Sequence, residues 1–182
     1  IVATEKLYTQ GSFANTGNAL DVAVSGRGFF QVELPDGTTG YTRDGAFQQN
    51  AQGELVTSSG YRLQPGITIP DGAQSITIGT DGIVQGRYSN GQSRNLAQVV
   101  LVNFNNPNGL QPMGGNQWAE TSVSGQPIVG APGSGTLGVL QSAAVEESNV
   151  DLTAELVSMI TAQRNYQANA QSIKTQDAIL QT

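Results

Sequence analysis

Short runs in which apolar and polar residues alternate dominate the first four fifths of the chain. Val22, Val24, Phe30, Val32 and Leu34 lie close to a period of two, which is typical of strands with one buried face. Glycines at 26 and 28 interrupt this run and indicate a bulge or turn between two short strands. Further runs rich in β-branched residues occupy 67–69, 75–78, 83–84 and 98–102.

Turn signals separate these runs at short intervals. Asp-Gly or Asn-Gly pairs stand at 36–37, 44–45, 71–72, 81–82, 90–91 and 108–109, and glycine there supplies a positive φ without steric cost. The sequence Pro35-Asp36-Gly37 between two apolar runs predicts a hairpin. Residues 105–138 are rich in Pro and Gly and are expected to be loop-like, with Trp118 anchored on a core or sheet face. The pattern predicts an all-β domain.

The pattern changes after residue 143, where Gly and Pro disappear. Leu152, Met159, Tyr166, Ile173 and Leu180 repeat every seven residues. The companion heptad positions are Leu156, Gln163, Ala170 and Asp177, and Asn149 or Asp151 can cap the start. The spacing predicts a helix of about 30 residues, roughly 45 Å long, with one narrow apolar stripe.

A small β domain cannot cover so long a stripe, so we expect partner helices to bury it. We call Leu152, Leu156, Met159, Tyr166, Ile173 and Leu180 the seam. The alternative is a helix folded back on its own domain. The fold class is therefore mainly β with a long C-terminal α-helix. We expect an extended lead-in over residues 1–15, a compact multi-stranded β domain over 16–140 and an assembly helix over 141–182.

Composition narrows the possible partners. The 182 residues include only 12% charged side chains, and the net charge is −6 with a pI near 4.4. Two lysines and six scattered arginines form no basic patch, which argues against binding to nucleic acid or an anionic membrane. No apolar stretch approaches the ~20 residues that span a bilayer. No cleavable signal is visible, and a first residue other than Met suggests an excised piece.

The chain offers little for catalysis. It contains neither Cys nor His, which excludes disulfides, thiol nucleophiles and histidine-based triads. Gly26-Arg27-Gly28 lacks the third glycine and the following helix of a phosphate loop. Carboxylates that could form a glycosidase pair are Asp21, Glu33, Asp36, Asp44 and Glu54, but most adjoin turns, where Asp serves local hydrogen bonding.

Acidic residues also gather before and within the first turns of the predicted helix, at 146, 147, 151 and 155. Negative charge at the start of a helix interacts favourably with the helix dipole. The spacing of these residues does not match an EF-type calcium loop. We expect no catalytic residue, metal or cofactor.

Several longer motifs resemble the bacterial flagellar axial rod and hook family. The strings TGNALDVAVSGRGFFQV (16–32), YTRDGAF (41–47), GELV (53–56) and GYRL (60–63) are similar to the family's globular-domain signature. SNVDL (148–152), ELVSMI (155–160), AQRNY (162–166) and IKTQD (173–177) are similar to its C-terminal signature. The motif residues in the β domain are Gly17, Asn18, Leu20, Asp21, Gly26, Gly28, Phe29, Phe30, Tyr41, Arg43 and Gly45.

The resemblance implies a self-assembling tubular subunit that transmits motor torque. In this family, N- and C-terminal helices form the inner wall of a helical homopolymer, with the β domain outside. Neighbouring rod, hook and ring proteins are the implied partners. The location is the periplasm-spanning rod or the extracellular hook, reached by type III export without a cleavable signal. The family's N-terminal helix is missing from this sequence, so we expect this piece to be monomeric.

The branch of the family and two other classes stay open. Residues 1–82 and the compact length favour the distal rod, while GRYSNGQ (86–92), 133–135 and the helix look more like the hook. A secreted carbohydrate-binding or adhesin domain would use exposed aromatics such as Tyr61, Tyr88 or Trp118. A wall-remodelling hydrolase would lose its activity when Asp21 or Asp44 is substituted. A phage-tail-like tube protein is a further structural alternative, and the flagellar motifs argue against it.

Overall fold

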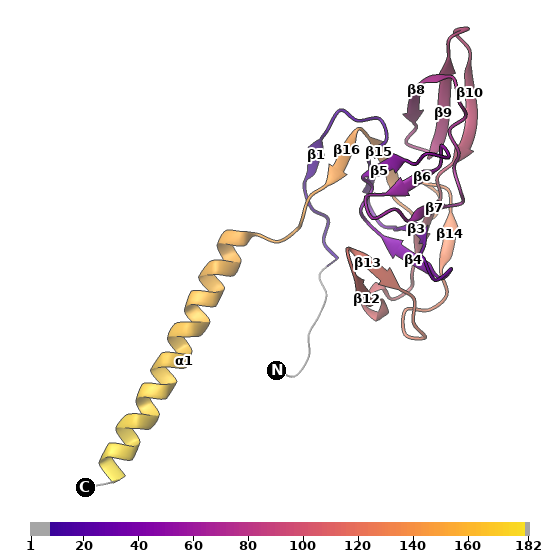
Figure 1. Ribbon diagram of the computed structural model, residues 1–182. Helices are drawn as coiled ribbons and strands as arrows, with labels where there is room; N and C mark the ends of the chain where they lie inside the picture. The colour runs from indigo at the N-terminus through magenta and orange to yellow at the C-terminus, as the bar shows by residue number, and fades with distance from the viewer. Residues whose placement is uncertain (1–7, 181–182) are drawn as a thin grey trace. The chain divides into compact units, whose positions relative to one another are not determined.

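The computed structural model describes residues 8–180, which form a β unit up to Glu147 and a helical unit from Ser148. The expected fold class is confirmed, because the β unit contains only strands, turns and one 3-10 turn (Pro107–Gly109) among the described residues, and the second unit is the α-helix α1 (Leu152–Leu180). Each unit is described by itself below (Figure 1).

A seven-stranded antiparallel sheet forms the main part of the β unit, in the order β12-β13-β4-β3-β7-β6-β5. Its strands are β3 (Phe30–Glu33), β4 (Thr39–Thr42), β5 (Phe47–Gln49), β6 (Leu55–Thr57), β7 (Arg62–Gln64), β12 (Gln111–Gly114) and β13 (Gln117–Ala119). The predicted hairpin joins β3 to β4, where the Leu34 amide donates to Thr38 and the Gly37 amide donates to Leu34.

A three-stranded antiparallel sheet, which we call the arm, extends beyond the rest of the β unit (Figure 1). It consists of β8 (Ala73–Ile78), β9 (Ile83–Tyr88) and β10 (Ser93–Gln98) in the order β10-β9-β8. Three further strand pairs complete the unit: β1 (Phe13–Asn15) with β16 (Ala144–Glu146), β2 (Val22–Ser25) with β15 (Val139–Ser142), and β11 (Leu101–Asn103) with β14 (Ile128–Gly130).

Two buried clusters hold these sheets together. The larger contains Val22, Val24, Phe30 and Phe47, and the smaller is mainly aromatic around Phe29 and Phe104. Burial alternates along β3, as the sequence pattern predicts, because successive side chains of a strand point to opposite faces. Burying each large apolar side chain contributes roughly 1.5–3 kcal/mol.

Some local expectations differ from the structure. Residues 67–69 form one bridge, Glu54 to Thr68, rather than a strand, and the run 98–102 is divided between β10 and β11. Residues 105–138, expected to be loop-like, include three short strands. These strands are only three or four residues long, and β12 carries an irregularity between Pro112 and Gly114, so their pattern is too short to recognise.

The ends of the β unit also differ from the expected division. The structure places β1 inside the segment taken as a lead-in, and β16 inside the segment taken with the helix. These two strands pair with each other, from Phe13 opposite Glu146 to Asn15 opposite Ala144. Such a pairing between residues about 130 positions apart in sequence has no local signal.

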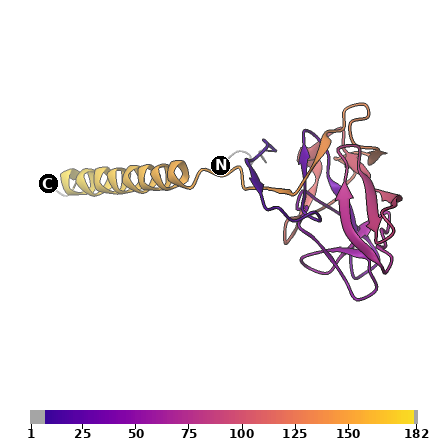
Figure 2. The ribbon, with the colours of Figure 1, turned by 90° about the horizontal axis from the view of Figure 1, so that it is seen from above.

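Helix α1 begins after Asp151, whose side-chain Oδ1 accepts hydrogen bonds from the amides of Thr153 and Ala154 at 2.9 and 3.2 Å. This is an ordinary N-cap, and it confirms one of the two predicted cap residues. Figures 1 and 2 show α1 as one unbroken helix. Within residues 8–180, no helix is long and apolar enough to cross a membrane.

Candidate assembly sites

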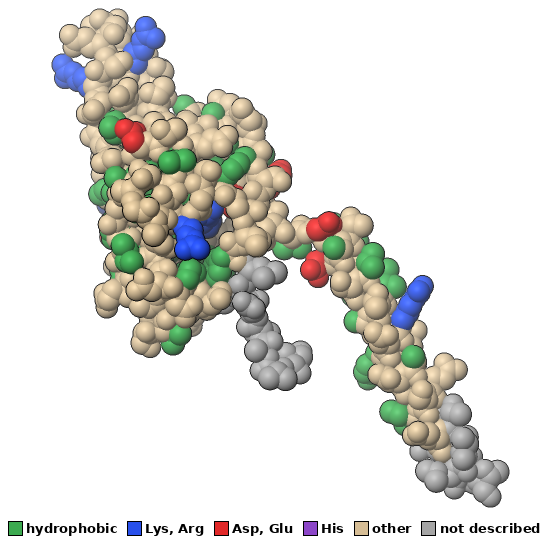
Figure 3. Space-filling view, turned by 180° about the vertical axis from the view of Figure 1, so that it is seen from behind, with side chains coloured by type: hydrophobic (Ala, Val, Ile, Leu, Met, Phe, Trp, Pro, Cys, Tyr) green, Lys and Arg blue, Asp and Glu red, His purple; other side chains and the backbone are tan. Residues whose placement is uncertain are grey.

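The apolar seam of α1 is exposed to solvent. Leu152, Leu156, Met159, Tyr166 and Ile173 are between 48% and 79% exposed, and the side chain of the sixth seam residue, Leu180, lies outside the described side chains. Apolar side chains are visible along the helix surface in Figure 3. A stripe of this kind leaves several large side chains in water, and each would stabilise a partner contact by roughly 1.5–3 kcal/mol if fully buried.

The apolar surface is wider in the first half of the helix than the heptad count indicates. Val157 and Ile160 are also exposed, at 59% and 48%. They stand one position after the seam residues Leu156 and Met159, so they broaden the apolar face to one side. The seven-residue repeat does not include this pair, so the heptad spacing alone gives no signal of it.

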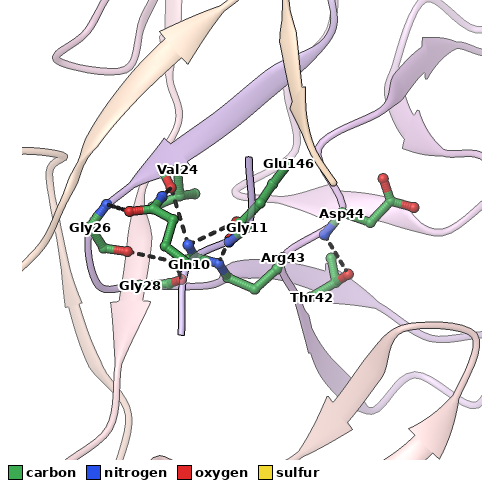
Figure 4. Close-up of polar contacts among 9 residues, drawn as sticks. All are labelled: Gln10, Gly11, Val24, Gly26, Gly28, Thr42, Arg43, Asp44 and Glu146. Carbon is green, nitrogen blue, oxygen red and sulfur yellow. Dashed lines mark hydrogen bonds and ion pairs between the residues drawn. The ribbon is translucent and has the colours of Figure 1, made fainter. Parts of the chain in front are cut away.

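A second site lies where the chain enters and leaves the β unit, and Arg43 is at its centre (Figure 4). Its guanidinium donates to the backbone carbonyls of Val24, Gly26 and Gly28 at 3.1, 2.9 and 2.6 Å. The same group forms an ion pair with Glu146 at 2.8 Å, and both side chains are largely buried. Arginine suits this role because its planar fork presents several donors in fixed directions.

Residues before β1 join the same network. The side chain of Gln10 donates to the Val24 carbonyl at 2.6 Å and accepts from the Gly26 amide at 3.1 Å. The Gly11 amide donates to the Glu146 carboxylate at 3.1 Å. We call the side chains of Gln10, Arg43 and Glu146, with the loop at 24–28 that they hold, the clasp.

The clasp and the β1–β16 ribbon bring the two ends of the β unit together. Beyond the ribbon, the Glu147 amide donates to the Ser12 carbonyl at 2.8 Å. The chain therefore enters and leaves the β unit at one place, and the clasp fixes that place to the loop between β2 and β3.

Three motif glycines are required by close packing, two in this loop and one against β2. A Cβ at Gly26, which has a φ of +109°, would lie 3.0 Å from the Gly138 Cα. A Cβ at Gly28, with a φ of +137°, would press on Leu101. A Cβ at Gly45 would lie only 1.7 Å from the Val22 carbonyl oxygen, a distance that no side chain can occupy. These motif positions maintain the backbone geometry on which the clasp depends.

The motif aromatics fill the two clusters. Phe30 packs edge-to-face on Phe47 in the larger cluster, while Phe29 and Tyr41 contact Phe104 in the smaller one. The buried Tyr41 hydroxyl donates to Glu120 at 2.9 Å. Burial, with help from this hydrogen bond and the Glu120 charge, raises the pKa of Tyr41 well above its usual range.

The first motif residues close a turn. Asp21 accepts from the Thr16 hydroxyl at 2.6 Å and from the Asn18 side-chain amide at 3.0 Å, and the Leu20 amide donates to Asn18 at 3.2 Å. Gly17 takes a positive φ of +72°. The carboxylate of Asp21 is therefore engaged in local structure.

Three of the other four carboxylates considered for catalysis also have local roles, while Glu33 is exposed at the end of β3. Asp36 accepts from the amide and hydroxyl of Thr38, and these bonds lower the pKa of its carboxyl. Asp44 accepts from the Ala46 amide, and Glu54 pairs with Arg62 at 3.2 Å. Within the described residues, no group of three or more acidic side chains is placed to hold a metal ion.

Aromatic contacts attach the lead-in to the β unit. The Tyr8 ring lies 5.5 Å from the Trp118 ring and 6.0 Å from the Phe29 ring, and its burial raises the pKa of its hydroxyl. Trp118 is half-buried against the smaller cluster, as expected of a sheet-face anchor. Sequence reasoning missed the roles of Tyr8, Gln10 and Glu146, since a lone residue in a polar stretch gives no signal of a distant partner.

Comparisons with known proteins agree with the motifs. Residues 23–86 match the family described as "Flagellar hook protein FlgE/F/G D1 domain", and residues 141–182 match "Flagellar basal body rod FlgEFG protein C-terminal". The flagellar basal-body rod protein FlgG of Buchnera aphidicola (subsp. Schizaphis graminum) is 47% identical over 182 residues, covering 99% of this chain and 70% of that protein.

Two further relatives show how the similarity is distributed. FlgG of Agrobacterium fabrum is 45% identical over 176 residues, covering 96% of this chain and 67% of that protein. The flagellar hook protein FlgE of Salmonella typhimurium is 49% identical over 138 residues, but the match covers 75% of this chain and only 33% of the hook protein. With similarity to FlgG proteins over nearly its whole length, the chain belongs to the flagellar rod and hook family.

Proposed function

We propose that this protein is a structural subunit of the bacterial flagellar rod, located in the flagellar basal body, and that it has no catalytic role. The observation that carries the proposal is the similarity to FlgG rod proteins along nearly the whole chain, from the lead-in to α1. The seam and the clasp are the two features that suit such a subunit.

The seam supplies the assembly surface. A helix of 29 residues with exposed Leu, Met, Tyr and Ile side chains gains most of its stability by packing on other helices. Copies of the same chain provide such helices at high local concentration in a polymer. The rod, hook and ring proteins next to the polymer are the other expected partners.

The clasp supplies a mechanical connection. Force that reaches α1 is carried along the chain to Glu147, where β16 is paired with β1 and held by Arg43. The load is then distributed over three carbonyls of the 24–28 loop and over the sheets behind it. A torque-bearing subunit needs such a joint at the point where its helix meets its outer domain.

The alternatives have less support. The hook reading rests on a relative that this chain matches over only a third of its length. A carbohydrate-binding surface would need exposed aromatic rings, whereas Trp118 packs against Tyr8, and the rings of Tyr61 and Tyr88 are each partly covered.

A chimera tests the rod assignment. The segment of Agrobacterium FlgG that matches this chain is replaced by the 182 residues, in a strain without its own FlgG. We expect restored swimming and complete rods in isolated basal bodies seen by electron microscopy. The matched control places the chain in the corresponding part of Salmonella FlgE, in a strain without FlgE. Rescue of hooks alone would overturn the rod assignment in favour of the hook.

A further inference from the structure

The arm carries two exposed arginines that have no carboxylate partner among the described residues. Among the described residues, Arg43 pairs with Glu146 and Arg62 pairs with Glu54. No carboxylate pairs with the three remaining arginines of the described β unit, Arg27, Arg87 and Arg94. Two of these three lie on the arm, in a protein whose net charge is −6.

Both arm arginines lie near its outer turn. Arg87 pairs across the sheet with Ser75 and Ser93, and Arg94 pairs with Gly86. Because neighbouring positions of a strand face opposite sides, the two guanidinium groups lie on opposite faces of the arm. Both are exposed, and that of Arg94 is 5.8 Å from the Tyr88 ring centre. Figure 3 shows two separate basic groups at the outer end of the arm.

The complementary charge lies on the stretch of chain that ends the β unit and begins α1. No Lys or Arg occurs between residues 95 and 163, whereas Glu147, Asp151 and Glu155 fall within nine residues and are all exposed. We call these three residues the acidic collar. The neighbouring Glu146 is already paired with Arg43, and no basic residue pairs with the collar within the described part of the chain.

We propose that the arm tip of one copy binds the acidic collar of a second copy. This inference rests on the proposed function and adds a contact to it. The arm and the collar are unlike surfaces of the same chain, so their contact is head-to-tail and leaves one free arm and one free collar at the ends. Contacts of this type continue into open helical polymers. The collar overlaps the start of the seam, since Leu152 lies between Asp151 and Glu155, and the seam also needs further copies.

The contact contributes specificity and association rate more than affinity. Exposed ion pairs each contribute little and are weakened by salt, while complementary charge steers the encounter of two surfaces. The contact is therefore strongest at low ionic strength. The arm–collar contact sets how two copies are aligned before their seam side chains are buried against each other.

Charge reversal tests the contact in the Agrobacterium FlgG chimera, because the 182-residue piece alone is expected to be monomeric. Three variants are compared with the unchanged chimera by sedimentation velocity at low salt: Arg87→Glu with Arg94→Glu, Glu147→Lys with Glu155→Lys, and all four changes together. We expect either pair alone to raise the concentration needed for self-association by about tenfold, and the fourfold variant to return it close to the value of the unchanged chimera. Asp151 is left unchanged because it caps α1. Arg27→Glu, an exposed arginine away from the arm, is the matched control and should have no effect.

Cysteine pairing identifies the contact directly, since the chain has no cysteine of its own. Copies carrying Arg94→Cys are mixed with copies carrying Glu147→Cys and oxidised, and we expect a disulfide-linked heterodimer that the Arg27→Cys and Glu147→Cys mixture does not form. If the FlgG chimera without these changes never self-associates, both this contact and the proposed assembly are overturned. If that chimera assembles and the reversals change nothing, or the fourfold variant is not restored, only the arm contact is overturned.

Discussion

Single residues in this protein act mainly by holding distant backbone segments together. Arg43 is the clearest case, because one guanidinium joins the 24–28 loop to the last strand of the β unit. Glu146 is only 12% exposed at its side chain, so its charge depends on that partner. The motif glycines act differently, since they create the space in which these segments approach.

Removing the Arg43 guanidinium should destabilise the β unit strongly. Arg43→Met leaves the mostly buried Glu146 charge and three carbonyls without their donor, and we expect a loss of about 2–4 kcal/mol in the free energy of unfolding. Arg62→Met is the matched control, because the Arg62–Glu54 pair is more exposed and should cost about 1 kcal/mol or less. Urea unfolding of both variants measures the difference. Equal losses in the free energy of unfolding would show that the clasp contributes no more stability than an exposed ion pair.

The glycine at 45 should tolerate no side chain. In Gly45→Ala the new methyl meets the Val22 carbonyl oxygen, so β2 must move, and we expect a loss of more than about 3 kcal/mol or failure to fold. Gly66→Ala is the control, since nothing lies within 4 Å of a Cβ there. Thermal unfolding followed by circular dichroism separates the two. A Gly45→Ala protein as stable as Gly66→Ala would contradict the packing argument.

Tyr41 should make stability sensitive to alkali. The pKa of its hydroxyl is raised in the folded state, chiefly by burial, so the folded protein keeps this proton while the unfolded chain loses it near pH 10. The resulting stability is fully present below about pH 10 and decreases above it, by up to about 1.4 kcal/mol per pH unit. Denaturant unfolding between pH 9 and about pH 11 should show a shallower decrease in Tyr41→Phe than in wild type, and parallel curves would refute the assignment.

At the scale of elements, the seam and the ribbon differ in what holds them: the described seam side chains are exposed to solvent, and the ribbon is held within the β unit. Helix α1 is a long local structure whose described apolar residues are exposed, and we propose that other copies of the chain cover them. The β1–β16 ribbon is only three residue pairs long, yet both its strands are fixed by the clasp. Assembly should therefore be sensitive to α1, and domain stability to the ribbon.

A charge on the seam should abolish assembly and spare the fold. With Leu156→Asp or Ile173→Asp in the chimeric rod protein, we expect no rods in isolated basal bodies, because a buried unpaired carboxylate is costly in a helix–helix contact. Ser158→Asp, placed on the opposite side of α1, is the matched control and should still assemble. The unfolding midpoint of the β unit should change little in all three variants. Normal rods with the seam variants would refute the seam.

At the scale of the whole molecule, the structure consists of two units joined after Glu147. The β unit contains both buried clusters, whereas every described side chain of α1 is exposed. We therefore expect the boundary to separate a domain that folds by itself from an element that needs partners.

Two truncated chains should locate this boundary. A chain that stops after Glu147 keeps β16 and the clasp, and we expect the same thermal midpoint for its β unit as in the complete chain. A chain that stops after residue 142 loses β16 and Glu146, and its midpoint should fall by several degrees. Differential scanning calorimetry measures both, and equal midpoints would show that the ribbon does not stabilise the domain.

The sequence by itself determined the fold class, the core of strands β2 and β3, the β3–β4 hairpin and the long capped helix with its seam. These features rest on local physics: a period of two or seven, a turn glycine, or a cap residue next to the helix it serves. The longer motifs also indicated the family, which the comparisons confirm.

Only the tertiary structure decided how the chain closes on itself. Gln10, Arg43 and Glu146 are up to 136 positions apart, and Phe13 and its partner Glu146 in the ribbon are 133 positions apart. Nothing local marks these residues as partners. Likewise, Arg87 and Arg94 look scattered in the sequence and come to one tip only because β9 and β10 pair. Long-range contacts depend on how the sheets pack, and the cost of bringing such distant segments together is repaid by the whole core rather than by the residues that meet.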